Sequence, residues 1–310
     1  MEKDERRFSS SRAVGVACAI TATGLGLAYL AAAGAPTILL LVNALSLAVG
    51  LALFAVMPYR IASRLPGGVV VLLGGMLLAT ALFGVSVDGA SRWIRVGGLS
   101  LQISLVVLPA MLVTFAHSRG FARTSGIILA AVALALQPDR AMAGVLAIAL
   151  AVLAIFRPDR WIASALAAGV VGFAITLMRP DSLPAVPYVD QILYTSFQVH
   201  ALAGIAVVGG ALLLTAPAIA RMRTERNHRE VHAVFGIVWL GVVVASALGN
   251  YPTPVVGYGG SAIIGYALSL SFLPGKVRSA AVDGERVEDV ASADTTGDPK
   301  LRVRVEYGSS

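Results

Sequence analysis

The sequence has few charged residues and a single cysteine. Only 13% of its 310 residues are charged, about half the share of a soluble domain, whereas 57% are hydrophobic. This composition excludes an ordinary cytosolic enzyme, a disordered chain and a nucleic-acid-binding protein built around a basic domain. Cys18 lies inside an apolar run, which excludes an internal disulfide or a cysteine metal cluster and favours a buried apolar role. We therefore predict a polytopic membrane protein.

Long apolar runs predict the membrane spans, because a helix needs roughly 20 apolar residues to cross a bilayer. The runs lie near residues 13–33, 36–57, 67–87, 99–116, 124–137, 141–156, 161–178, 191–216, 232–248 and 259–274. The fifth and sixth are short, and we expect their ends to extend into the loops or one of them to tilt. The fold class predicted is all-α, a bundle of about ten transmembrane helices.

The basic residues predict the orientation of these spans. With the N-terminus inside, 20 of the 24 Lys and Arg residues fall on the inner side, and Arg92, Arg95, Arg140 and Arg179 fall outside. Both termini are then cytoplasmic. The predicted organisation is a cytoplasmic tail at 1–12, a transmembrane domain at 13–274 and a disordered cytoplasmic tail at 275–310.

The first outward loop of interest, residues 88–98, contains Arg92, Trp93 and Arg95. Two arginines outside run against the strong inward bias of the others. One interpretation is a ligand that carries phosphate at the outer leaflet, since a guanidinium binds phosphate oxygens bidentately. The other is that both arginines reach lipid headgroups while Trp93 anchors the interface. The sequence of this loop does not decide between the two interpretations.

Three further outward loops carry polar residues. Gln137-Pro-Asp-Arg140 is a tight turn in which Asp139 suits a turn or helix N-cap. Residues 178–190 end on Asp190, which either caps the next helix or serves function. Residues 250–261 contain two prolines and three glycines before Ser261 and cannot form a continuous helix, so they are expected to line a cavity or be buried in protein.

The spans themselves offer little chemistry. Gln102, Gln198 and His200 are their notable polar residues, and His200 is expected to be a hydrogen-bonded core residue rather than a ligand. The sequence shows no metal-ligand spacing, no Ser-His-Asp pattern and no phosphate-binding glycine loop on the inner face. A proton or ion pump is disfavoured, because such proteins carry ionisable residues inside their helices.

Three outward segments, in order, resemble the SEDS proteins (shape, elongation, division and sporulation), which include peptidoglycan polymerases. Gly89-Ala-Ser-Arg-Trp-Ile-Arg-Val-Gly97, followed by Gln102 and Ser104, is similar to the family signature Gly-x-x-Arg-Trp-Ile-x-Leu-Gly…Gln-Pro-Ser-Glu. Gln137-Pro-Asp139 matches a Gln-Pro-Asp turn. Residues 253–261, which include Tyr258-Gly259-Gly260-Ser261, are similar to Leu-Pro-Phe-x-Ser-Tyr-Gly-Gly-Ser. The resemblance spans residues 13–274.

The resemblance implies roles for individual residues. Asp190 stands at the place of the family's catalytic aspartate. The implied substrate-binding residues are Arg92, Trp93, Arg95, Gln102, Gln137, Asp139, Arg140, Tyr258, Gly259, Gly260 and Ser261. The sequence departs from the family at Ile103, Leu105 and Leu108, which replace Pro, Glu and Lys, and at Gln198-Val199, which replace a Glu pair.

The resemblance also implies an activity and partners. The expected function is a glycosyltransferase that polymerises lipid II, the undecaprenyl-diphosphate-linked disaccharide, at the outer leaflet of the bacterial inner membrane. A divalent cation could assist, and a class B penicillin-binding protein is the implied partner. The alternatives are a non-catalytic SEDS homologue that binds the precursor or a partner, and a flippase for a lipid-linked sugar. The location expected is the cytoplasmic membrane.

Overall fold

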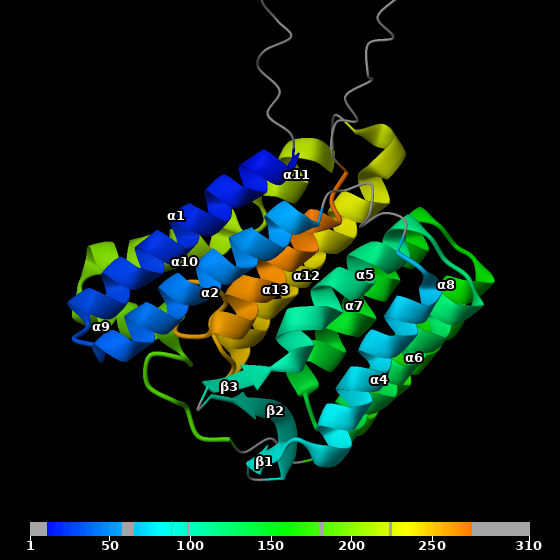
Figure 1. Ribbon diagram of the computed structural model, residues 1–310, viewed down its shortest axis with the longest axis horizontal. Coiled ribbons are helices and arrows are strands. Elements are labelled where there is room, and N and C mark those ends of the chain that lie inside the picture. Colours follow the sequence, from blue (N-terminus) through cyan, green and yellow to red (C-terminus); the bar gives the residue numbers. More distant parts are fainter. Residues whose placement is uncertain are drawn as a thin grey trace, which may run out of the picture. The chain divides into compact units, whose positions relative to one another are not determined.

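A computed structural model describes residues 11–57, 65–87, 89–97, 99–179, 183–222 and 225–274, and the tail predicted at 275–310 lies outside them. The helices of the first half are α1 (Ser11–Ala32), α2 (Thr37–Val56), α4 (Gly67–Phe83), α5 (Ile103–His117), α6 (Phe121–Leu136) and α7 (Arg140–Phe156). Those of the second half are α8 (Arg160–Leu177), α9 (Ile192–Val199), α10 (Ala201–Leu213), α11 (Ala216–Met222), α12 (Arg229–Leu248) and α13 (Gly260–Ser271), with a 3-10 turn, η2 (Arg226–His228), before α12. Figure 1 shows their arrangement.

The helices confirm an all-α polytopic membrane protein. Among the described residues, four helices (α1, α2, α8 and α12) are long and apolar enough to cross a membrane, and the number is five if the bent pair α10–α11 is counted as one span. Five shorter apolar helices, α4, α5, α6, α7 and α13, have 12 to 17 residues. These ten segments correspond to the ten apolar runs of the sequence.

Helix α5 forms the centre of the bundle. Its residues from Ile103 to Ala116 are almost all buried, and it packs against α12, α13 and α7 (Figure 1). A helix that is apolar on every side needs protein around it, which these neighbours supply. Helices α4 and α6 approach closely at Gly74 and Gly126, where a Cβ on either would lie within about 2.5 Å of the other helix's backbone.

A three-stranded antiparallel sheet is the feature that the sequence did not predict. Strands β1 (Val85–Val87), β2 (Ala90–Val96) and β3 (Leu99–Gln102) follow one another in the order β1-β2-β3. Gly89 and Gly97 take positive φ angles of 82° and 56° at the two turns, which a residue with a Cβ rarely adopts. The span predicted at 99–116 was therefore wrong at its start, because residues 99–102 are a strand.

The span predicted at 191–216 is also interrupted. The backbone at His200 is extended (φ −168°, ψ 147°), which ends α9 and starts α10. His200 is exposed, and its Nδ1 accepts a hydrogen bond of 3.1 Å from the backbone N–H of Leu202. The expectation of a core histidine was wrong, because the ring caps the N-terminus of α10.

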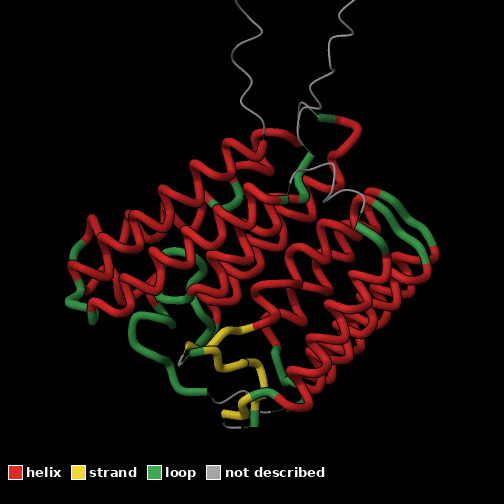
Figure 2. The backbone as a smooth tube through the Cα atoms, viewed as in Figure 1, coloured by secondary structure: helices red, strands yellow, loops and turns green. Residues whose placement is uncertain are grey.

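The loops gather at two ends of the bundle. The strands lie at one end beside the loop that leads to α9 (Figure 2), and we call the described parts of residues 84–103, 136–140, 177–192 and 248–260 the sheet end. The opposite end contains the loops at 117–121 and 156–160 and the turn at 225–229. Arg92, Arg95, Arg140 and Arg179 thus lie at the sheet end, apart from Arg119 and Arg157 at the other. Which end faces the cytoplasm stays a prediction.

Candidate active site

Strand β2 brings three predicted residues to the sheet end. In its pairing with β3, Trp93 lies opposite Gln102 and Arg95 lies opposite Ser100. The strand pairing therefore fixes the position of Gln102, the last residue before α5, next to the Arg-Trp motif. The backbone N–H of Gln102 donates a 2.9 Å hydrogen bond to the hydroxyl of Ser261, which joins this hairpin to the start of α13.

Two loops far apart in sequence pair beside the hairpin. Asp190 forms an isolated antiparallel bridge with Pro252. The N–H of Thr253 donates to the carbonyl of Val189 at 2.9 Å, and the N–H of Tyr258 donates to the carbonyl of Tyr188 at 2.7 Å. These backbone bonds hold the segment that contains Asp190 against the segment that contains Tyr258.

The hairpin and the two loops surround one cavity of about 360 Å³. Of the predicted site residues, its walls contain Arg92, Trp93, Arg95, Gln102, Asp190, Tyr258, Gly259 and Ser261. Three aromatic rings, those of Trp93, Tyr251 and Tyr258, line the same space. The cavity therefore combines a carboxylate, two guanidinium groups and aromatic surfaces in a volume suited to a small polar group.

Asp190 is the carboxylate of this cavity, and its residue is only 8% exposed. Burial raises the pKa of Asp190 above its ordinary value of 3.8, and the hydrogen bond that Oδ2 accepts from the N–H of Val186 at 2.8 Å opposes that rise. Tyr188 and Gln191 on either side adopt left-handed φ angles of 63° and 57°. Such backbone is uncommon outside glycine and concentrates at functional sites.

Arg92 is buried, with 3% of its surface exposed, whereas Arg95 is exposed at the cavity wall. The Arg92 guanidinium donates to the carbonyl of Pro138 and lies 5.9 Å from the ring centroid of Tyr251. A side chain that reached the lipid headgroups would be exposed, so this interpretation does not fit Arg92. The contact with Pro138 also ties the hairpin to the Gln-Pro-Asp turn.

Gln137 and Asp139 do not line the cavity, and their contact with substrate stays a prediction. Both are fully buried. The Gln137 amide donates to the carbonyl of Leu77 at 2.8 Å. Asp139 caps α7 by accepting from the N–H of Met142 at 3.2 Å, and it also accepts from Ser104 Oγ at 2.8 Å and Gln102 Nε2 at 3.1 Å. Its role is to anchor Gln102 behind the cavity.

Arg140 and Gly260 also lie elsewhere. A Cβ at Gly260 would come within 2.2 Å of Ser46 Oγ, so this glycine permits α13 to pack on α2. Arg140 lines a second cavity of about 560 Å³, and it donates to the carbonyl of Arg179 at 3.0 Å. The remaining lining is mostly apolar: Ala141, Gly144, Val145, Ile148, Phe173, Leu183, Ile237, Leu240, Gly241, Val244, Ala245, Leu248, Gly249, Asn250 and Tyr251.

The two cavities share a wall that sequence reasoning missed. Leu183, Asn250 and Tyr251 line both. Asn250 Nδ2 donates to the carbonyl of Leu183 at 3.0 Å, and Asn250 Oδ1 accepts from Gln191 at 2.7 Å. The sequence could have predicted the role of Asn250 from its position at the start of the loop 250–261, which was expected to line a cavity.

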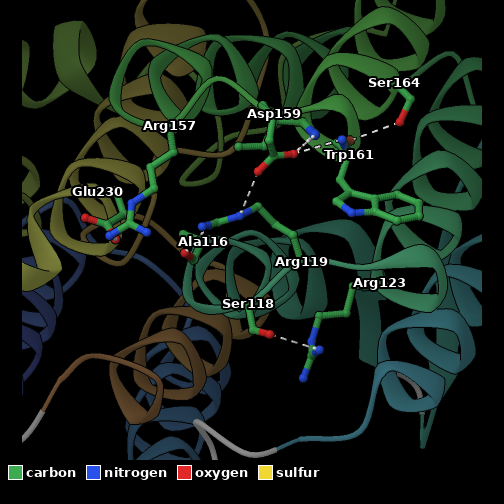
Figure 3. Close-up of polar contacts among 10 residues, drawn as sticks. Ala116, Ser118, Arg119, Arg123, Arg157, Asp159, Trp161, Ser164 and Glu230 are labelled. Carbon is green, nitrogen blue, oxygen red and sulfur yellow. Dashed lines mark hydrogen bonds and ion pairs between the residues drawn. The ribbon is translucent and has the colours of Figure 1, made fainter.

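Charged residues at the opposite end pair with one another (Figure 3). Arg119 lies 3.1 Å from Asp159, and Arg157 lies 3.2 Å from Glu230. Asp159 also caps α8 through the N–H groups of Trp161 and Ile162. No three His, Cys, Asp or Glu side chains in the described part of the chain are placed to hold a metal ion. The two ion pairs join the ends of α5, α7, α8 and α12.

Fold and site together define a polytopic helical membrane protein with an acidic and basic cavity at one end. A crystal structure of the Thermus thermophilus rod shape determining protein RodA is similar, with a TM-score of 0.59, 20% identity, and coverage of 83% of this chain and 93% of that chain. An aspartate-to-alanine mutant of that RodA gives a TM-score of 0.59, 20% identity and coverage of 83% and 94%.

A third similar chain comes from a structure of a peptidoglycan synthase complex, with a TM-score of 0.56, 22% identity and coverage of 83% and 94%. No family model matches the sequence, and no curated protein sequence matches it significantly. The chain has the fold of the SEDS proteins, the family of RodA, and the resemblance predicted from three motifs is confirmed at the level of the fold.

Proposed function

We propose that this protein is a peptidoglycan glycosyltransferase that polymerises lipid II at the outer leaflet of the bacterial cytoplasmic membrane, for cell shape or division. The observation that carries the proposal is the cavity of about 360 Å³ whose walls contain Asp190, Arg92 and Arg95. The likeness to RodA and to a chain of a peptidoglycan synthase complex supports it. Fold alone does not carry function, so the argument depends on the cavity.

Asp190 would act as the general base. The acceptor sugar hydroxyl attacks the anomeric carbon of the donor, the bond from that carbon to the diphosphate breaks, and the hydroxyl proton passes to Asp190. The diphosphate leaves with the bonding electrons. A carboxylate whose pKa burial has raised is a stronger base than an exposed one, which suits this step.

Arg92 and Arg95 would stabilise the leaving diphosphate. Guanidinium groups match phosphate oxygens in shape and charge, and they act most strongly in a site that excludes water. If a divalent cation takes part, the carboxylate of Asp190 would be the side chain of this cavity that holds it. The cation would add positive charge at the leaving group.

The second cavity suits the isoprenoid chain of such a substrate. Its walls are mostly apolar, Ile148, Val244 and Leu248 are exposed on it, and Arg140 stands among them as a cation. It shares Leu183, Asn250 and Tyr251 with the cavity of Asp190. An amphiphile could thus place its chain in one cavity and its head in the other.

The test is polymerisation of lipid II by the purified full chain. We expect Asp190→Asn to slow the reaction by on the order of 100-fold to 10,000-fold, the usual value of a general base. Asp159→Asn, at the opposite end, is the matched control and should keep the activity. Equal rates for Asp190→Asn and the unsubstituted protein would remove Asp190 from the mechanism.

One observation favours a second function, a non-catalytic homologue that binds the precursor. Leu105 lines the cavity of Asp190 at the position where the family has Glu, so one polar group of the family is replaced by an apolar one. In that case the unsubstituted protein would bind lipid II without forming polymer. The flippase alternative has less support, because the apolar spans contain almost no ionisable residues mid-helix that could couple transport to an ion.

A class B penicillin-binding protein is the proposed partner, by analogy with the chain found in a peptidoglycan synthase complex. Co-purification of the tagged chain with such a transpeptidase tests this, and recovery of the chain alone would contradict it. For location we propose the bacterial inner membrane with both termini inside. Reporter fusions that are active only in the cytoplasm, placed at each terminus, check the orientation.

A further inference from the structure

Asn43 is a polar residue in the middle of α2 that the sequence analysis passed over. It is fully buried in a helix that is otherwise almost wholly apolar. A buried amide without partners costs a few kcal/mol, and more in a membrane, so its hydrogen bonds explain why such a residue is tolerated. Asn43 Nδ2 donates to the carbonyl of Gly257 at 2.9 Å, and Asn43 Oδ1 accepts from the N–H of Gly259 at 3.2 Å.

These two bonds hold the peptide on each side of Tyr258. The N–H of Tyr258 itself donates to the carbonyl of Tyr188, two residues before Asp190. Three consecutive residues, 257 to 259, are therefore fixed by the amide of Asn43 and by the strand-like pairing with the Asp190 loop. Tyr258 and Gly259 both line the cavity of Asp190.

The same segment is held one residue earlier by two glycines. Val256 is fully buried between α1 and α10. A Cβ at Gly26 would lie 2.4 Å from the carbonyl oxygen of Val256, and a Cβ at Gly210 would lie 2.7 Å from its side chain. Three membrane helices thus meet the segment, and α2 is the one that contacts it through hydrogen bonds.

We propose that Asn43 is a positioning residue for the proposed glycosyl transfer: its amide fixes the backbone on both sides of Tyr258 and so holds Tyr258 in the wall of the Asp190 cavity. The proposal rests on the proposed function for its catalytic consequence. A packing role would need only the volume of the side chain, whereas this role needs a donor and an acceptor in one group.

Hydrogen exchange of the purified full chain in nanodiscs measures how firmly the two Asn43 hydrogen bonds hold residues 257–259, without reference to activity. Asn43→Leu keeps the branched shape and the number of heavy atoms and removes both bonds. We expect the amide of Gly259 to exchange about 10-fold faster, the effect of one lost hydrogen bond. Ser46→Ala is the matched control on the same helix, since Ser46 contacts α13 without holding the segment, and it should leave that exchange unchanged.

Asn43→Asp gives a signature that a packing role would not. A neutral carboxyl can donate to Gly257 and accept from Gly259, whereas an ionised one cannot donate and repels the Gly257 carbonyl. An ionised carboxylate still accepts from Gly259, so the informative amide is that of Tyr258, which shares its peptide with the Gly257 carbonyl. We expect protection of the Tyr258 amide near the unsubstituted level at low pH and its loss as the introduced carboxyl ionises, each rate being divided by that of the unsubstituted protein at the same pH. The titratable residues on the helices that pack against α2 are Arg12, Cys18 and Tyr29 on α1 and Tyr266 on α13, and Arg12 contacts Phe54 and Met57 near the far end of α2. Those of the two paired loops are Tyr188, Asp190, Tyr251 and Tyr258.

The outcomes separate this proposal from the proposed function. Unchanged exchange of Gly259 in Asn43→Leu, or no pH dependence in Asn43→Asp, would overturn the positioning role whatever the protein catalyses. In the polymerisation assay, Asn43→Leu should lower turnover about 10-fold. The turnover of Asn43→Asp, divided by that of the unsubstituted protein at the same pH, should recover at low pH. Faster exchange with unchanged turnover would overturn the catalytic consequence. Absence of polymer from the unsubstituted protein would refute the proposed function alone.

Discussion

The two ends of the bundle use their charged residues in opposite ways. At the opposite end, Arg119 pairs with Asp159 and Arg157 pairs with Glu230. At the sheet end, the loops are joined by backbone bonds, by neutral amides and by hydrogen bonds from Arg92 and Arg140 to backbone carbonyls. No described cation forms an ion pair with Asp190. Burial and the Val186 N–H are the two influences on its pKa. The carboxylate of Asp190 is therefore held by a neutral backbone donor, whereas those of Asp159 and Glu230 are held by guanidinium groups.

The largest difference between the ends is expected from two aspartates with the same local role. Asp139 caps α7 and Asp159 caps α8. Asp139→Ala should lower the free energy of unfolding by about 3 kcal/mol, because it leaves the buried Gln102 and Ser104 without their acceptor. Asp159→Ala should cost about 1 kcal/mol, the usual value of a cap, since this side chain is partly exposed. Unfolding titrations in detergent measure both, and equal costs would contradict the contrast.

A glycine pair on α1 sharpens the comparison within one helix. Gly26→Ala should destabilise the protein by about 2 kcal/mol, because its Cβ would meet the Val256 backbone 2.4 Å away. Gly24→Ala, one half-turn earlier, meets nothing within 4 Å and should be neutral or slightly stabilising. Thermal unfolding of both variants is the measurement. An equal loss of thermal stability in both variants would mean that the close packing of Gly26 against Val256 does not stabilise the protein.

The pH dependence of activity should report Asp190. Because burial raises its pKa, the proposed base gains a proton at a higher pH than an exposed aspartate, and the rate should fall about 10-fold per unit below that pKa. The contribution of Asp190 to the free energy of unfolding changes with pH in the opposite direction, because the folded state favours the protonated carboxyl. This contribution is fully present below the ordinary pKa of 3.8 and is lost as the pH rises through the raised pKa. Rate profiles of lipid II polymerisation check this, and a midpoint at or below 3.8 would contradict it.

The smallest effect is expected from the ion pair of the opposite end. Arg119→Ala removes a contact whose carboxylate is partly exposed, so it should cost at most about 1 kcal/mol and leave polymerisation unchanged. High salt should weaken the same pair in the unsubstituted protein. A large loss of activity in this variant would show that the two ends are coupled.

The sequence predicted the parts of the site that depend on local chemistry. The ten apolar runs, the separation of Arg92 and Arg95 from the other arginines, and the cavity-lining loop at 250–261 follow from hydropathy, charge and backbone restriction, which act over a few residues. The resemblance to SEDS proteins added Asp190 by position. These properties can be recognised without knowing which helices are neighbours.

Contacts between distant segments decided the rest. Gln137 and Asp139 belong to the same motif as Arg140, yet packing buries the first two behind the cavity and leaves the third in another. Asn43 meets Gly257 and Gly259 more than 200 residues away. Composition and periodicity fix where a chain enters the membrane, because solvation acts on each segment separately. Which polar groups meet depends on how the helices pack, and only the tertiary structure contains that information.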